Sequence, residues 1–222
     1  MGYQLNFWAL AGYLSLFAQG AGTTLALTAI ASTIGIALSI GGAATARWGV
    51  RWARSLIAAY VELIRNTPFL IQLFFIFFGL PSLGVKLTAL QAAVLAMTIN
   101  LTAYSIEILR AGIESVSRGQ REAGLALGIS PMAVFIYLIL PQAVANVYPA
   151  LVSQIVITML ESAVVSQIAV VDLTHVADYI QSRTYRAFET YFAITLVYLC
   201  MALSLRWLLA RAGSKLFLGR SG

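Results

Sequence analysis

Ionisable side chains inside apolar runs are the residues of this chain best placed to bind a solute. Glu62 and Arg65 stand three residues apart in one run, and Glu107 and Arg110 in another. A charge inside a membrane is costly and has to pair or face a polar interior, and side chains three residues apart on a helix can pair. We therefore expect two structural ion pairs. Glu161 stands unpaired in a third run, which makes it a candidate for function.

Bond-making chemistry finds little support in the sequence. An enzyme inside the membrane needs converging groups, such as a Ser/Lys pair, paired Asp residues or a His-rich metal site. The apolar runs contain no Asp and no Lys, the single His175 lies outside them, and Cys200 is the single cysteine. No phosphate-binding Gly-x4-Gly-Lys-Ser/Thr loop occurs. We expect no enzyme here, with no catalytic residue, metal site or cofactor in this chain.

The composition indicates an integral membrane protein. Of the 222 residues, 60% are hydrophobic and 10% are charged, and the mean hydropathy is +0.87. Soluble domains carry about 25% charged residues. The net charge of +6 could suggest nucleic acid as a partner, but the basic residues lie at the ends of apolar runs, which is how membrane orientation is encoded.

Five apolar segments are long enough to span a bilayer as helices. Their approximate ranges are 20–45, 54–80, 87–110, 132–160 and 189–212. The second is expected to kink at Pro68, which removes a backbone donor and clashes with the preceding turn. Before the first span lies an amphipathic segment suited to the membrane interface, marked by Phe7, Trp8, Tyr13 and Phe17. The sequence thus predicts an all-α integral membrane protein with one transmembrane domain, residues 1–222.

Basic residues predict the orientation of these spans. Ten of them lie on one side: Arg47, Arg51, Arg54, Arg110, Arg118, Arg121, Arg206, Arg211, Lys215 and Arg220. The opposite connections hold three, Lys86, Arg183 and Arg186, diluted by acidic residues. Because Lys and Arg collect in cytoplasmic loops, the N-terminus is expected outside and the C-terminus inside.

The cytoplasmic segment 119–131 is polar, rich in glycine and set between two apolar runs. Gly119 is suited to end the preceding helix in a left-handed conformation, and Glu122 suits the positive end of the next short helix. Gly128 is expected to end that helix, and Pro131 to open the following one. The residues alone fit an ordinary interhelical loop about as well as a docking helix.

The spacing of Glu122-Ala-Gly, Gly128 and the later Pro141 resembles the EAA loop of bacterial ABC-transporter permeases. In that family the loop forms a short cytoplasmic coupling helix that docks in a groove of the ATPase subunit. The resemblance assigns this coupling role to Gly119, Gln120, Glu122, Ala123, Gly128 and Pro141. Gly124 stands where the family usually has a second Ala, which is expected to loosen the helix by up to about 1 kcal/mol.

Three more segments are similar to those of polar-amino-acid permeases. The residues around Pro68 look like the family's Arg-Gly-Thr-Pro-Leu, with Asn66 in place of Gly, and the run from Asn100 looks like its Ala-Tyr-x2-Glu-x2-Arg-Gly-Gly-Ile. Near Glu161 the family commonly has Leu-Lys-Asp-Thr-Ser-Leu, and Leu160 replaces the Lys. A cationic group of the substrate is then the partner expected for Glu161. The alternatives are pairing with a partner subunit or a position near the outer interface.

A tentative substrate pathway follows from these segments, formed by Asn100, Thr102, Glu161 and Ser162. The resemblance implies the permease subunit of a binding-protein-dependent ABC importer for polar amino acids, of the histidine, glutamine, arginine or opine type, in the bacterial inner membrane. It also implies the partners: a second permease subunit (a copy or a paralogue), two ATPases that bind ATP and Mg, and an extracytoplasmic solute-binding protein. The polar segment 172–190 either faces that protein or is a solvated connection.

A stand-alone ion-coupled carrier is the alternative function. Such carriers usually have more spans and ionisable groups within them for coupling, and Glu161 alone supports this weakly. A co-purifying ATPase separates the two hypotheses. The sequence leaves open which amino acid is carried, whether the subunit pairs with itself, and whether it holds the substrate site.

Overall fold

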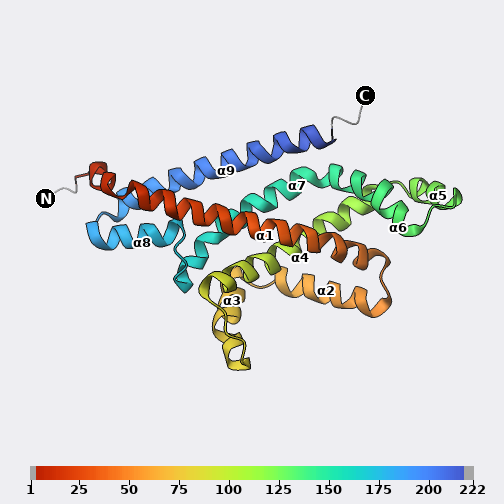
Figure 1. The fold of residues 1–222 in the computed structure, drawn as a ribbon, viewed down its shortest axis with the longest axis horizontal. Coiled ribbons are helices and arrows are strands. Elements are labelled where there is room, and N and C mark those ends of the chain that lie inside the picture. The colour runs from red at the N-terminus through yellow and green to blue at the C-terminus, as the bar shows by residue number, and fades with distance from the viewer. Residues whose placement is uncertain (1–3, 218–222) are drawn as a thin grey trace. The chain divides into compact units, whose positions relative to one another are not determined.

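The computed structural model describes residues 4–217, and this part of the chain is helical without strands (Figure 1). The elements follow one another as η1 (Phe7–Tyr13), α1 (Leu14–Trp48), α2 (Arg51–Arg65), α3 (Phe69–Phe74), η2 (Phe75–Gly79), η3 (Leu80–Leu83), α4 (Ala89–Ser115), α5 (Arg118–Ala126), α6 (Pro131–Ala133), η4 (Val134–Ile139), α7 (Leu140–Glu161), η5 (Ser162–Ile168), α8 (Leu173–Thr184) and α9 (Ala187–Phe217). The elements η2 and η4 are π turns, and the other η elements are 3-10 turns. Arg220, one of the basic residues that predict the orientation, lies outside the described residues.

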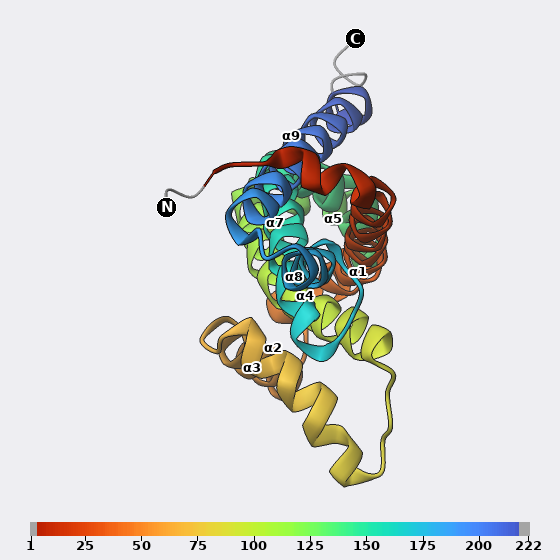
Figure 2. The same cartoon turned by 90° about the vertical axis from the view of Figure 1, so that its left-hand side faces the viewer.

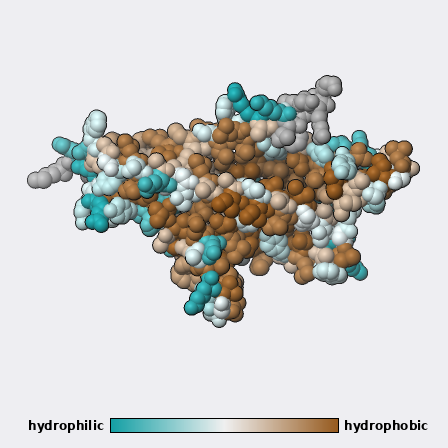
Figure 3. Space-filling view, in the orientation of Figure 1, coloured by the Kyte–Doolittle hydropathy of each residue, from teal (hydrophilic) through white to brown (hydrophobic). Residues whose placement is uncertain are grey.

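Four helices in the described part are long and apolar enough to cross a membrane. They are Phe7–Trp48, Ala89–Ser115, Pro131–Ile168 and Ala187–Lys215. A fifth crossing results if the broken pair Arg51–Arg65 and Phe69–Leu83 forms one span. Hydrophobic side chains, brown in Figure 3, make up most of the visible face. Residues 4–217 are therefore all-α with four or five candidate spans.

The break in the second predicted span lies where the sequence places it. Helix α2 ends at Arg65, and Pro68 is the N-cap of α3 with φ −62° and ψ 138°. Proline in this extended conformation cannot continue the first helix. The Glu62 carbonyl at the end of α2 accepts two donors of Asn66, the backbone N–H at 3.1 Å and the side-chain Nδ2 at 2.8 Å.

The chain consists of two compact units, each assembled from separate stretches of the sequence. The first contains 1–33, 67–98 and 156–205, and the second contains 34–66, 99–155 and 206–222. The core of the first unit joins η1, α1, α8 and α9, which Figure 2 shows from the N-terminal side. Its buried members are Leu10, Phe17, Leu173, Val176, Ala177, Ile180 and Ile194. The core of the second unit consists of Ala43, Leu109, Ile113, Val134, Ile139, Ala143 and Leu151.

The aromatic N-terminal segment is helical and continuous with the first candidate span. The 3-10 turns of η1 run directly into α1, so that one helix extends from Phe7 to Trp48. The reason is packing: Leu10 and Phe17 are 6% and 8% exposed and contact the apolar face of α8.

The polar segment 172–190 contains a helix, α8, that packs one face into the core of the first unit. Asp172 is fully buried, and its carboxylate caps α8 by accepting the His175 backbone N–H at 2.8 Å. Its second oxygen accepts the Tyr198 hydroxyl at 3.2 Å. Burial raises the pKa of Asp172, and these hydrogen bonds oppose that shift.

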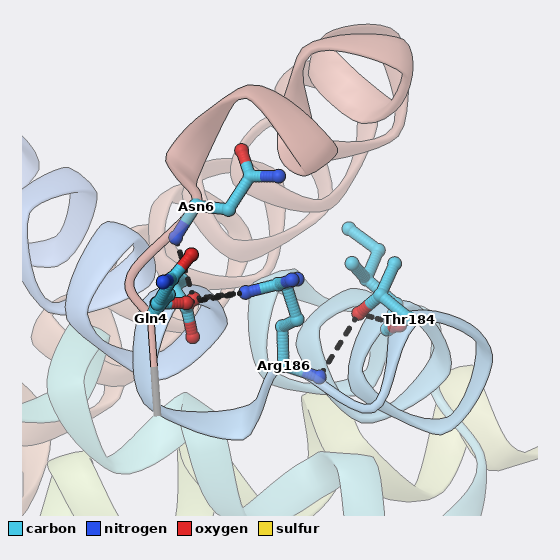
Figure 4. Close-up of polar contacts among 6 residues, drawn as sticks. Gln4, Asn6, Thr184 and Arg186 are labelled. Carbon is cyan, nitrogen blue, oxygen red and sulfur yellow. Dashed lines mark hydrogen bonds and ion pairs between the residues drawn. The ribbon is translucent and has the colours of Figure 1, made fainter. Parts of the chain in front are cut away.

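A second buried carboxylate ties the N-terminal residues to the start of α9. Glu189 has no exposed surface, and its Oε1 accepts the Asn6 backbone N–H and the Arg186 guanidinium, each at 2.9 Å. Arg186 also donates to the Gln4 carbonyl at 3.0 Å, and its backbone N–H donates to the Thr184 hydroxyl (Figure 4). A buried charge that is paired and hydrogen-bonded in this way fixes the segment it holds.

Close approach of α1 to α8 generates a stability prediction. A Cβ at Gly20 would lie 2.9 Å from the Leu173 Cα and 3.0 Å from the Asp172 carbonyl oxygen. Backbone atoms cannot move aside cheaply, so we expect Gly20→Ala to lower the free energy of unfolding by about 1–3 kcal/mol. Thermal unfolding of the detergent-solubilised protein measures this.

Gly22→Ala is the matched control in the same helix. A Cβ at Gly22 meets no atom within 4 Å, so the better helix propensity of Ala should leave stability unchanged or raise it by up to about 1 kcal/mol. Equal melting temperatures for the two variants would contradict the close packing of α1 on α8.

Candidate functional site

The predicted coupling segment contains a short helix, α5, that packs on η4 near the start of the candidate span Pro131–Ile168. Gly124 is the buried residue of α5. A Cβ there would lie 2.9 Å from Val134 Cγ2 and 3.0 Å from Leu138 Cδ1 of η4. The departure from the family pattern at Gly124 therefore has a structural reason: the missing methyl group lets the α5 backbone approach η4.

The end of α5 is a Schellman motif. The Gly128 N–H donates to the Leu125 carbonyl at 3.0 Å, and the Ile129 N–H to the Gly124 carbonyl at 3.2 Å. Gly128 has φ 76°, in the left-handed region that glycine adopts without strain. The predicted stop at Gly128 is thus present.

The following helix begins as the sequence predicts. Ser130 is its N-cap and accepts the Ala133 N–H on its hydroxyl at 3.3 Å, and Pro131 occupies the first turn. Pro141 lies further on, in the first turn of α7, directly after the π turns of η4. Proline lacks the N–H that would donate to the carbonyl four residues back, and its ring crowds that carbonyl. In a π turn the helical hydrogen bonds shift by one residue, so the π turns of η4 lie where Pro141 disturbs the regular α-helical pattern.

Two predictions about the segment 119–131 are wrong. Gly119 does not end the preceding helix in a left-handed conformation, because α4 already ends at Ser115 and Gly119 is the second residue of α5. The turn between the helices is made by Ser117, with φ −61° and ψ 140°. Glu122 is the fifth residue of α5 and exposed, so it does not lie in the first turn near the positive end of the helix.

The outward face of the segment combines polar and apolar side chains. Gln120, Glu122 and Ala123 are exposed on α5. Apolar side chains beside them are exposed as well: Leu125 (37%), Leu127 (80%), Ile129 (38%) and Met132 (67%). An exposed apolar patch with a polar rim is typical of a protein–protein contact.

Trp48, the last residue of α1, connects this helix to α5. The Arg121 guanidinium of α5 lies over its ring at 5.8 Å, and Arg47 at 6.0 Å. The Phe135 ring of η4 meets it edge-on, with centroids 5.0 Å apart. Trp48 is not among the residues predicted from the sequence, although an aromatic ring next to Arg47 at the end of a span is a detectable cation–π signal.

Arg110 is a paired cation near the end of α4. Its Nε donates to Glu107 at 3.0 Å and its Nη1 to Glu114 at 2.7 Å. The predicted Glu107–Arg110 pair is therefore present. Glu62 and Arg65 do not pair, although their spacing predicted it; Arg65 lies over the Tyr104 ring at 5.4 Å instead. Both residues are exposed, so no burial cost forces them together.

Asn100 and Thr102 lie near the middle of α4 and are 3% and 7% exposed. The Thr102 hydroxyl donates to the Gly35 carbonyl of α1 at 3.4 Å. Nearby, the Tyr60 hydroxyl of α2 donates to the Ile99 carbonyl at 2.6 Å. These polar groups belong to the second compact unit.

Glu161 and Ser162 lie in the first unit, at the junction of α7 and η5. Ser162 is fully buried and donates to the Met159 carbonyl at 2.7 Å. Glu161 is half-buried, and within residues 4–217 its carboxylate has no hydrogen bond or ion pair to a protein group. A half-buried carboxylate without a partner is available to a cation.

Comparisons with known proteins agree with this architecture. The arginine transport system permease protein ArtQ of Bacillus subtilis (strain 168) is 33% identical over 209 residues, 92% of this chain and 94% of that protein. The probable glutamine ABC transporter permease protein GlnM of the same organism is 40% identical over 147 residues, 66% of this chain and 68% of that protein. A solved structure described as an amino acid ABC transporter with histidines is 39% identical, with a TM-score of 0.87 over 96% of this chain and 100% of that one.

The family model described as "Binding-protein-dependent transport system inner membrane component" matches residues 34–217. This range includes α2 to α9 and part of α1. The chain belongs to the family of binding-protein-dependent transport system inner membrane components.

Proposed function

We propose that this chain is the membrane-spanning subunit of an ATP-driven ABC importer for a polar amino acid. The observation that carries the proposal is α5, a short helix stopped at Gly128 and seated on η4 at Gly124, with Glu122 exposed. Relatives that transport arginine or glutamine support an amino acid as the substrate. The alternative function, a stand-alone ion-coupled carrier, would leave α5 without a role.

The mechanism follows from how α5 is anchored. A partner ATPase binds ATP and Mg, and its closure moves α5 through the exposed face around Glu122. The contacts of Gly124 with η4 and of Arg121 with Trp48 pass this motion to α7 and α1. The spans then alternate between inward-open and outward-open states. This chain binds no nucleotide and breaks no bond itself.

The proposed assembly has two ATPases and two permease subunits in a bacterial inner membrane. The distribution of basic residues favours an N-terminus outside and a C-terminus inside, with five spans when α2 and the turns after Pro68 cross together. An extracytoplasmic binding protein delivers the amino acid. The proposed path of the amino acid is lined by Asn100, Thr102, Glu161 and Ser162. Glu161 binds the ammonium group of a cationic or zwitterionic amino acid.

Glu122 and Gly128 test the coupling role directly. We expect Glu122→Lys to reverse the charge of the docking face, and Gly128→Asp to strain the left-handed stop, so that both abolish ATP-driven uptake while insertion is unchanged. The tagged chain is purified in mild detergent from its native cell. A stoichiometric ATPase should accompany the unaltered chain and be lost from Glu122→Lys.

Gly84→Asp is the matched control, because Gly84 has φ 85° and ends η3. It should leave uptake unchanged. An unaltered chain that transports alone, without an ATPase, would refute the importer and favour the carrier.

Substitution of Trp48 tests whether α5 passes its motion to α1. A cation–π contact is worth about 0.5–1 kcal/mol at exposed sites, so Trp48→Ala should loosen α5 without unfolding the chain. We expect uptake per ATP hydrolysed to fall several-fold in proteoliposomes, while the ATPase still co-purifies. Trp207→Ala is the control, since Arg211 lies over that ring at 4.1 Å within α9 alone. Equal effects of the two variants would remove Trp48 from the coupling route.

Glu161 tests the substrate pathway. We expect Glu161→Gln to lower the affinity for a cationic amino acid about tenfold or more, because a hydrogen bond to a charged group is worth about 1.5–3 kcal/mol. Assembly with the ATPase should be unchanged. The concentration dependence of uptake measures this, with Glu114→Gln, an exposed carboxylate on α4, as the control. Unaltered kinetics in Glu161→Gln would exclude Glu161 from the pathway.

A further inference from the structure

Four arginines line a cleft between α1, α2 and α4. The cleft has a volume of about 870 Å³ and lies within the second compact unit. Its arginines are Arg51, Arg54 and Arg65 of α2 and Arg110 of α4, and its carboxylates are Glu62 and Glu107. With four guanidinium groups against two carboxylates, the cleft carries a net positive charge.

Helix α2 turns its basic side toward this cleft and its apolar side away from it. The lining residues recur every three or four positions, which places them along one side of the helix; they are Arg51, Arg54, Ala58, Glu62 and Arg65. The exposed apolar residues Trp52, Leu56 and Leu63 lie on the other side and do not line the cleft. Charged residues of a membrane segment face a polar interior or a water-filled cavity and mark solute pathways. The cleft is therefore a candidate part of such a pathway.

Arg65 is the arginine of the cleft that is best placed to bind a solute. It is the last residue of α2, directly before the break of the candidate span, and interrupted helices form the substrate sites of many secondary transporters. Its guanidinium lies over the Tyr104 ring of α4 at 5.4 Å, which orients the group without neutralising it. In the described part of the chain no carboxylate lies within ion-pair distance of Arg65, and Glu107 is engaged by Arg110.

The path proposed for the amino acid lacks a partner for one charge that every amino acid carries. Glu161 can bind the ammonium group, but the other residues of the path are uncharged, so the carboxylate meets no cation. Asn100, a residue of that path, stands four positions before Tyr104 on the same face of α4. The ring beneath Arg65 is thus one helical turn from the path. A guanidinium group matches a carboxylate in two parallel hydrogen bonds.

We propose that Arg65 binds the α-carboxylate of the transported amino acid, with the Tyr104 ring holding the guanidinium in place. This inference rests on the proposed function. Arg51 stands fourteen residues earlier, about 21 Å along the helix, so it cannot bind the same carboxylate. Arg110 is held by Glu107 and Glu114. Because the carboxylate is common to all amino acids, Arg65 recognises the class of solute, and other residues distinguish its members.

Binding of an amino acid and of its α-amide tests this role. The probes are L-arginine, L-glutamine, L-argininamide and L-glutaminamide, titrated in a calorimeter into the nucleotide-free complex purified from its native cell, without binding protein. We expect the unaltered complex to bind at least one acid about tenfold more tightly than its amide. Arg65→Gln should weaken that acid about tenfold or more and leave the amide unchanged. Arg65→Lys keeps the charge without the two parallel hydrogen bonds and should retain part of the preference.

Arg51→Gln is the matched control, because it removes the same charge from the same side of α2 at the far end of the helix. It should change the affinity for the acid less than twofold. Equal losses for acid and amide in Arg65→Gln would indicate a general effect on charge or folding and overturn the proposal. So would an unchanged affinity for the acid, or an unaltered complex that binds neither acid. If Arg65→Gln does not insert, Arg65→Lys and its melting temperature take its place in the comparison.

The same preparation separates this proposal from the proposed function. A chain that purifies without an ATPase and transports alone would contradict the importer, and the comparison of acid and amide would still decide the role of Arg65. A complex that contains the ATPase, but whose preference for the acid survives in Arg65→Gln, would leave the importer intact and exclude Arg65 from carboxylate binding.

Discussion

Every backbone N–H and C=O group in the hydrocarbon core of a membrane has to find a partner within the protein, because no water is present to replace one. The described chain meets this constraint with long helices, and side chains assist where the helix is broken. On either side of Pro68, Asn66 donates to the Glu62 carbonyl at 2.8 Å and Gln72 donates to the Thr67 carbonyl at 3.0 Å. The Glu62 carbonyl also accepts the Asn66 backbone N–H at 3.1 Å, so the Asn66 side chain adds a second donor there.

The length of α5 bears on its proposed mechanical role. A helix of nine residues is too short to be stable alone, so its order comes from what it contacts. Gly124 seats it on η4, the motif at Gly128 closes its end, and Arg121 places it over Trp48. Anchoring at two elements leaves the outer face free for a partner. A loosely tethered loop of equal composition could bind the same partner but could not move the spans.

Local rules predicted the parts of the structure that depend on local chemistry. Pro68, Gly128 and Pro131 act within a few residues, and their effects on helix ends were visible in the sequence. Features that depend on distant packing were not. Gly124 was interpreted as a loss of helix propensity, whereas its role is set by Val134 and Leu138 across the turn. Spacing likewise predicted a pair at Glu62 and Arg65 that their exposure does not require.

The acidic residues near α8 have a packing role that the sequence did not show. In the sequence, Glu189 only diluted the positive charge of its connection, but in the structure it pairs with Arg186. Since α8 is a packed helix capped by Asp172, the proposed binding protein would meet ordered residues if it docked there, such as Tyr179 and Tyr185, exposed by 45% and 87%. Docking to a preformed surface of this kind avoids the ordering entropy that a flexible loop would lose on binding.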